Sequence, residues 1–298
     1  MRDISARLTA RPPRYGAAVT SSSAELTDAR PQQPRALIVS LYGLYAREAG
    51  GWLSVGSLVR LLADLGVDEP AVRSSISRLK RRGILESRRI GAVAGYALSA
   101  EARSILAEGD RRIFERLRGN VNDGWLLAVF SVPESEREKR HTLRSRLSWL
   151  GFGTVAAGVW IAPAHLDLET RHVLERYGLA AYVDLFRADY LAFGDATELV
   201  AKWWDLARLG DLYGDFVAEY GAVLARWRRR RSTNDPVAFV DYVRALTQWR
   251  RLPYLDPGLP ADVLPRGWPG VRAAEVFFEL HNRLAEPAHR HVAGLDPS

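Results

Sequence analysis

The segment DEPAVRSSISRLKRRG, residues 68–83, restricts the possible folds more than any other part of the chain. Asp68 suits the N-cap of a helix, Pro70 suits its first turn, and Gly83 suits its end. At about 100° per residue, the apolar side chains of the segment fall on one face: Val72, Ile76 and Leu79. The segment therefore predicts a helix that packs one narrow face onto neighbouring helices.

The opposite side of this predicted helix is basic. Small hydroxyl residues lie beside arginines there, and beyond the first turn the helix has no acidic residue. Arg donates paired hydrogen bonds to guanine, Ser bonds to several base edges, and flanking cations pair with phosphates. We therefore predict that the helix enters a DNA major groove through Arg73, Ser74, Ser77, Arg78, Arg81 and Arg82. The alternatives are an ordinary solvated face and a surface that binds an acidic protein.

The segments around this helix predict the rest of a small domain. They are helices over 35–49 and 53–66, strands over 84–90 and 95–99 joined by the turn GAVAG, and a helix over 100–119. Three helices, a hairpin and a further helix predict a winged helix-turn-helix domain over residues 34–120. Arg88 and Arg89 lie on its hairpin, where they suit contact with the DNA backbone or the minor groove.

The distribution of charge agrees with this assignment. The net charge is +7, and residues 1–120 hold 20 Lys and Arg against 12 Asp and Glu, whereas the remainder holds 22 against 23. A basic domain joined to a neutral one suggests a polyanion-binding head and a body with another task. Residues 1–33, rich in Pro and Ser, predict a disordered leader, and its arginines could form a minor-groove arm.

The composition limits the chemistry and the location. With no cysteine, the chain has neither disulfides nor thiol catalysis, which fits a cytoplasmic protein. No stretch approaches the roughly 20 apolar residues that cross a bilayer, so no membrane association is expected. The histidines show no metal-binding spacing, and we predict no metal site and no cofactor.

The pattern changes after residue 120. Residues 121–194 predict a ferredoxin-like α+β domain, which would serve as a scaffold for dimerisation or effector binding. The expected elements are strands over 125–132 and 153–163, helices over 134–152 and 167–178, and a third strand within 179–191. Residues 195–298 predict a helical domain, interrupted by a Pro-rich segment at 253–270. The fold class is therefore α+β.

Three stretches in this order resemble the PaaX family of bacterial transcriptional regulators. They are PRALIVSLYGLYAREAGGWLSVGSLVRLLADLGVDEPAVRSSISRLKRRGIL, WLLAVFSVPESEREKRHTLRSRLSWLGFGTVAAGVWIAP and RRLPYLDPGLPADVLPRGWPG. The resemblance extends over residues 34–286, and the proline run ending in WPG is its most specific part.

The resemblance implies a cytoplasmic, homodimeric repressor that binds palindromic operators near genes for aromatic-acid breakdown, typically of phenylacetate. It implies release from DNA by the CoA thioester phenylacetyl-CoA and not by the free acid. The recognition helix would be 69–83. Wings of this family usually keep a basic or polar residue near the tip, and GAVAG has none, which leaves that contact to Arg88 and Arg89.

An effector of this kind needs cations for its phosphates and an apolar pocket for its acyl group. The run RWRRRR at 226–231 could supply the cations, chiefly Arg226 and Arg228, or could simply end a helix. Candidate linings for the acyl group are Trp249, Tyr254 and Trp268. Aromatic residues in helical domains also serve as core, and that alternative stays open.

A nucleic-acid-processing enzyme is the alternative function. The predicted central domain resembles the small CRISPR adaptation nuclease, whose metal-dependent chemistry needs a carboxylate near the end of the first strand. That position holds Ser131 and Val132, and Asp123 lies at the other end of the strand. We therefore expect a scaffold and no catalytic residue.

Overall fold

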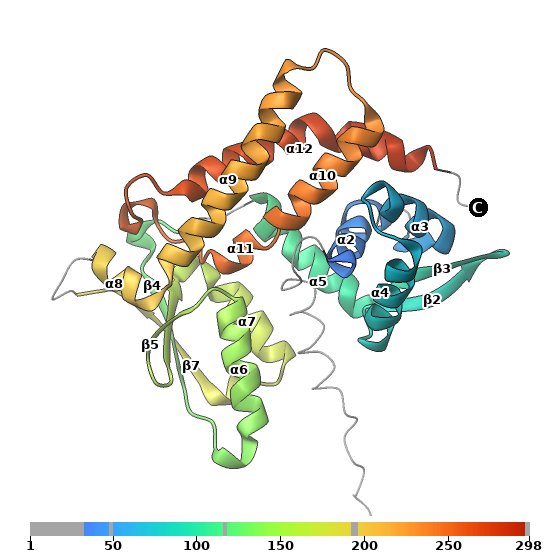
Figure 1. The fold of residues 1–298 in the computed structure, drawn as a ribbon. Helices are drawn as coiled ribbons and strands as arrows, with labels where there is room; N and C mark the ends of the chain where they lie inside the picture. The colour runs from blue at the N-terminus through green and yellow to red at the C-terminus, as the bar shows by residue number, and fades with distance from the viewer. Residues whose placement is uncertain (1–32, 48–49, 116–117, 192–195, 296–298) are drawn as a thin grey trace, which may run out of the picture.

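The computed structural model describes residues 33–47, 50–115, 118–191 and 196–295. The predicted leader lies outside these residues except for Gln33. The first elements are α2 (Pro34–Leu41), a π-helical turn (Tyr42–Ala46), β1 (Trp52–Ser54), α3 (Val55–Asp64), α4 (Glu69–Arg81), β2 (Leu85–Ile90), β3 (Val93–Leu98) and α5 (Ala100–Asp110), which continues as a π-helical turn (Arg111–Glu115). Figure 1 shows these elements as one compact group beside the long C-terminal helices.

The hairpin differs from the prediction in two ways. The turn consists of only two residues, because Ile90 pairs directly with Val93, and Gly91 adopts the positive φ of 60° that such a tight turn needs. A third strand, β1, pairs with β3 to give the antiparallel order β1-β3-β2. Sequence periodicity missed β1 because three residues are too few to show alternation.

The central part has the order β4 (Trp125–Phe130), α6 (Arg137–Trp149), β5 (Gly153–Ala156), β6 (Val159–Pro163), α7 (Asp167–Arg176) and β7 (Val183–Ala188). The four strands form an antiparallel sheet in the order β5-β6-β4-β7. Residues 153–163, which were predicted as one strand, form two strands that reverse at Gly158, where φ is 75°. Helices α6 and α7 cover one face of this sheet (Figure 1).

The C-terminal part is helical. It contains α8 (Ala196–Trp203), α9 (Leu206–Arg229), α10 (Asp235–Trp249), the short α11 (Leu252–Leu255) and α12 (Pro269–Ala293). Helices α8 and α9 are separate, because the Asp205 side chain accepts a hydrogen bond from the backbone N–H of Arg208 and starts α9 anew. No helix among the described residues is both long and apolar enough to cross a membrane.

The hydrophobic cores do not follow the order of the chain. One continuous core joins α2, α3, α4 and α5 to α9, α10 and α12, whereas the central sheet has a core of its own. Helix α2 packs against both α4 and α10. Between α10 and α2, the buried hydroxyl of Thr247 donates to the hydroxyl of Ser40 at 2.7 Å. The N-terminal part and the helical C-terminal part therefore share one hydrophobic core.

Candidate nucleic-acid interface

Helix α4 forms as its sequence predicts. The Asp68 carboxylate accepts a hydrogen bond of 2.7 Å from the backbone N–H of Ala71, which satisfies a free donor of the first turn. Gly83, at φ 69°, follows the helix and lets the chain turn back toward β2. The apolar face of α4 is buried against α2 and α3 through Val72, Ile76 and Leu79.

The side of α4 that faces away from this core is the basic one. All eight residues predicted to contact DNA have exposed side chains: Arg73, Ser74, Ser77, Arg78, Arg81, Arg82, Arg88 and Arg89. Lys80, which the sequence reasoning left out, is exposed as well, and its ammonium lies 5.6 Å from the ring centre of Tyr96 in β3. A groove of about 350 Å³ separates α4 from α3 and β3 at this point, and Ser77 and Lys80 line it.

Arg73 differs from the other arginines of α4. Its guanidinium donates to the Glu69 carboxylate one turn earlier, with Nε at 2.8 Å from Oε1. The pair is exposed, so it stabilises the helix only slightly. A phosphate would have to compete with Glu69 for the guanidinium of Arg73.

The two hairpin arginines occupy successive positions of β2, so their side chains leave opposite faces of the sheet. Arg89 turns back to the tip, where its guanidinium donates to the carbonyl of Ala92 at 3.0 Å. Arg88 lies opposite Gly95, and its carbonyl accepts a hydrogen bond from the Trp52 indole at 3.0 Å. A Cβ at Gly95 would come within 2.4 Å of the Trp52 ring, so this glycine is needed for the strand to pass under the indole.

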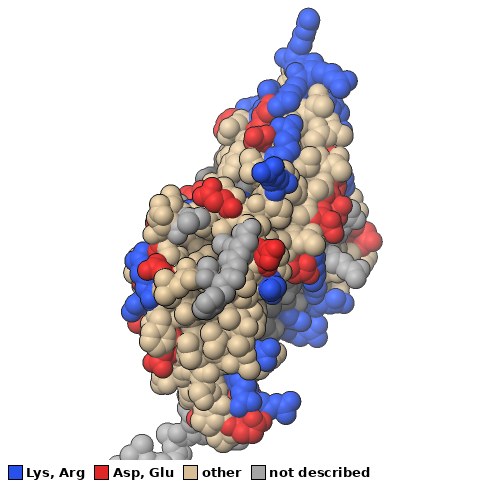
Figure 2. All heavy atoms as spheres, turned by 90° about the vertical axis from the view of Figure 1, so that its left-hand side faces the viewer, with Lys and Arg blue, Asp and Glu red and all other residues tan. Residues whose placement is uncertain are grey.

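The five residues predicted to bind an effector are not brought together. Arg226 forms an ion pair with Asp241 at 2.5 Å, and Arg228 forms one with Glu279. Both arginines belong to the last turns of α9, which end in the basic tip at the top of Figures 1 and 2. The aromatic candidates Trp249, Tyr254 and Trp268 are buried far from this tip.

Trp249 is a core residue, which is the alternative to a ligand contact that the sequence left open. Its side chain is 0% exposed, and its indole N–H donates to the carbonyl of Ile113 at 3.0 Å. It ends α10, eight residues after Asp241, the partner of Arg226, so about 12 Å of helix separates the two. Trp249 therefore belongs to the core and does not line a site at the arginine tip.

The carboxylates before and after β4, where a nuclease would need one, are engaged in other contacts. The Asp123 side chain accepts from the backbone N–H of Asn120 at 2.9 Å and caps a short turn before β4. Glu134 and Glu136 form ion pairs with Arg140 and Lys139. Within the described parts of the chain, no three His, Asp or Glu side chains are arranged to hold a metal ion.

Comparison with known proteins follows the same three-part division. Residues 33–102 match the family model of the PaaX-like protein, residues 118–200 match the PaaX protein central Cas2-like domain, and residues 204–294 match the PaaX-like protein C-terminal domain. The chain is 28% identical to the Transcriptional repressor PaaX of Escherichia coli over 273 residues, which cover 89% of this chain and 85% of that protein.

A solved structure has the same fold. An uncharacterized protein of Mycobacterium tuberculosis superposes with a TM-score of 0.52 at 24% identity, over 84% of this chain and 99% of the other. The three family models match in order and together span nearly all of the described chain. The chain therefore belongs to the PaaX family.

Proposed function

We propose that this protein is a DNA-binding transcriptional repressor. Residues 34–120 would be a winged helix-turn-helix domain, with α4 as the recognition helix and the β2–β3 hairpin as the wing. The observation that carries the proposal is the outward face of α4, which combines exposed Ser74 and Ser77 with exposed Arg78 and Arg81. This combination suits base edges and phosphates in a major groove.

The similarity to a named transcriptional repressor over most of the chain supports the same function. From the family resemblance we further propose that the regulated genes serve aromatic-acid catabolism of the phenylacetate type. The effector would be an acyl-CoA thioester such as phenylacetyl-CoA, and the protein would act in the cytoplasm. An enzymatic role has less support, because the carboxylates near β4 are engaged in capping and ion pairs.

Residues 121–194 would be a ferredoxin-like domain that joins two copies of the chain, and residues 195–298 a helical domain. The part of the sheet's second face that α8 leaves uncovered supports the dimer. Leu126 and Ala128 point into the core beneath α6 and α7, so Leu127 and Val129 lie on the other face. Phe186 of β7 pairs with Leu127 and is 51% exposed, which places an apolar patch on this free face.

A homodimer with two-fold symmetry would present two recognition helices to successive major grooves of a palindromic operator, about 34 Å apart or a multiple of it. An effector that binds the free dimer more tightly than the DNA-bound dimer would then release the repressor.

The test is a fluorescence-anisotropy titration of the full chain against a duplex from its own upstream region and against a scrambled duplex, at several salt concentrations. We expect tighter binding to the upstream duplex, with loss of this preference when phenylacetyl-CoA is added and no loss with phenylacetate. Equal affinity for both duplexes at every salt concentration would refute the repressor assignment. Sequence-specific binding that ignores the thioester would retain the repressor and reject this effector.

A further inference from the structure

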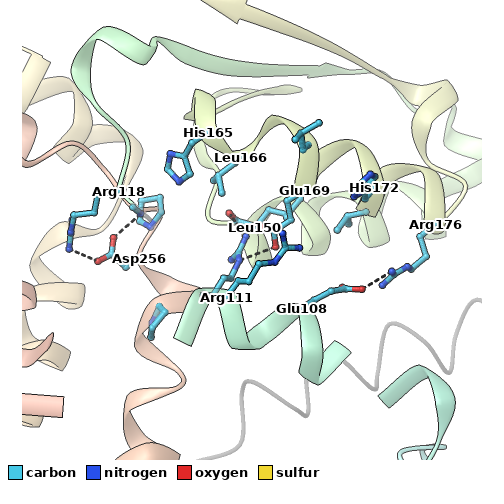
Figure 3. Close-up of a pocket in the computed structure, with 16 residues that line it drawn as sticks. Glu108, Arg111, Arg118, Leu150, His165, Leu166, Glu169, His172, Arg176 and Asp256 are labelled. Atoms are coloured by element: carbon cyan, nitrogen blue, oxygen red, sulfur yellow. Dashed lines mark hydrogen bonds and ion pairs between the residues drawn. The ribbon is translucent and has the colours of Figure 1, made fainter. Parts of the chain in front are cut away.

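A cavity of about 440 Å³ lies where the three parts of the chain meet. Its walls come from α5 and the π-helical turn after it, from α7 and the turn before it, and from the segment that follows α11 (Figure 3). None of its residues stood among the predicted effector contacts. The linear pattern does not indicate it, since side chains that meet there, such as Arg112 and Glu169, are 57 positions apart.

The cavity has a surplus of positive charge. Three of its four arginines pair with its three carboxylates: Arg112 with Glu169 at 3.0 Å, Arg118 with Asp256 at 3.1 Å and Arg176 with Glu108 at 2.6 Å. The fourth, Arg111, is exposed and has no partner among the residues that the structure describes. An anionic group that enters the cavity therefore finds one guanidinium already available.

A second polar group on the wall lacks a partner. The Nδ1 atom of His165 is buried and forms no hydrogen bond with any described residue. Burial lowers the pKa of His165, and the nearby charge of Arg112 lowers it further, so the imidazole is neutral near pH 7. A neutral imidazole with an unused nitrogen suits a hydroxyl or amide group of a ligand.

Apart from His172, the rest of the wall is apolar. It is formed by leucines, a valine and prolines: Leu150, Leu166, Leu168, Val173, Pro253 and Pro257. Leu168 is 70% exposed, although it lies next to the charged groups. An apolar wall beside an available cation matches a ligand that joins an anionic group to an aromatic or aliphatic part.

The ion pairs of the cavity tie the DNA-binding part to the central sheet. Arg176 of α7 holds Glu108 of α5, and α5 begins two residues after the hairpin strand β3 ends. On the neighbouring turn, Arg112 donates to the carbonyls of Trp149 and Leu150 at 3.0 and 3.2 Å. A change in these contacts would shift α5, and with it the hairpin, relative to the central sheet.

We propose that this cavity is the effector site, a step that rests on the proposed function of a ligand-released repressor. The ligand would be an organic anion, with its carboxylate or phosphate bound by Arg111 and its apolar part against Leu168. Its anion competes with Glu108 for Arg176, so binding loosens α5 from α7 and moves the wing away from its DNA-bound position. In this mechanism, release needs no contact between effector and DNA.

The test is isothermal titration calorimetry of the full chain, without DNA, with three probes: phenylacetyl-CoA, CoA and phenylacetate. Arg111→Ala removes a charge-assisted contact and is expected to weaken binding of the tightest probe by about 10- to 100-fold. Glu108→Gln frees Arg176 and is expected to tighten binding several-fold. Arg144→Ala, an exposed arginine on α6 outside the cavity, is the matched control and is expected to change nothing.

Opposite effects of Arg111→Ala and Glu108→Gln would support the cavity, because misfolding cannot tighten binding. If CoA without an acyl group binds tightly, the anionic group in the cavity is a CoA phosphate. If phenylacetate is the one probe that binds, the anionic group is a carboxylate. Unchanged binding in both variants, or no binding of any probe, would overturn the proposal. The DNA titration is separate, so specific DNA binding together with a failed calorimetric test would reject the cavity and keep the repressor.

Discussion

Replacing Trp249 by Phe tests whether the N-terminal and helical parts share one core. The indole is completely buried and stacks on Phe277 of α12 with ring centres 4.7 Å apart. Its N–H satisfies the carbonyl of Ile113, which belongs to the turn after α5. One side chain therefore joins α10, α12 and the segment that leads from the DNA-binding part to the central sheet.

The expected loss has two parts. Phe cannot donate, so the carbonyl of Ile113 loses its side-chain donor, at a cost of about 1–3 kcal/mol. The missing five-membered ring removes packing worth about 1 kcal/mol. We therefore expect Trp249→Phe to lower the free energy of unfolding by about 2–4 kcal/mol, measured by urea denaturation.

Trp268→Phe is the matched control. This tryptophan is also buried, but its indole N–H has no hydrogen-bond partner among the described residues, so only the packing loss of about 1 kcal/mol applies. Equal losses in the two variants would refute the role given to the Trp249 hydrogen bond. Separate unfolding of the N-terminal and C-terminal parts in the wild-type chain would refute the shared core.

Three further predictions concern DNA binding, pH and the hairpin. If Arg78 and Arg81 contact base edges, Arg78→Ala and Arg81→Ala should each weaken operator binding by about 1–3 kcal/mol. If they contact phosphates, each change should lower the slope of log affinity against log salt concentration by about 1. Anisotropy titrations at several salt concentrations distinguish the two, and unchanged binding in both variants would contradict the placement of α4. Burial lowers the pKa of His165 and His281, so the folded chain binds protons less readily than the unfolded chain. Stability should therefore fall as pH drops from about 7.5 to about 5.5, and the urea midpoint should depend less on pH after both are changed to Gln; a midpoint that rises on acidification would contradict this. Gly95→Ala places a Cβ 2.4 Å from a carbonyl oxygen of β1, so it should lower the free energy of unfolding by about 1–3 kcal/mol. Thermal unfolding measures the loss, and an unchanged melting temperature would show that the hairpin adapts.

The ion pairs around the cavity and the shared core have different consequences for regulation. Because the N-terminal part shares a core with the helical part around Trp249, it cannot swing freely on a linker. The contacts across the cavity are ion pairs with partly exposed side chains, such as Glu108 with Arg176, and these exchange partners more easily than buried aromatic rings. The ion pairs between α5 and α7 are therefore easier to change than the aromatic core around Trp249.

Local signals in the sequence determined helix α4. The cap at Asp68, the apolar spacing of Val72, Ile76 and Leu79, and the turn at Gly83 each act within a few residues, so they could be recognised before any fold was known. The order of helices and strands in the central part followed from the same kind of pattern. The hairpin at Gly158 did not, because a continuous apolar run hides a two-strand reversal.

Only the tertiary structure decided the rest. Whether Trp249 faces a ligand or a core depends on its hydrogen bond to a carbonyl 136 positions away. The cavity exists because α5, α7 and the segment after α11 meet in space. Three of its arginines have carboxylate partners, and Arg111 has none among the residues that the structure describes. Burial and pairing are properties of contacts between distant segments, and the linear order of residues does not specify which of those contacts form.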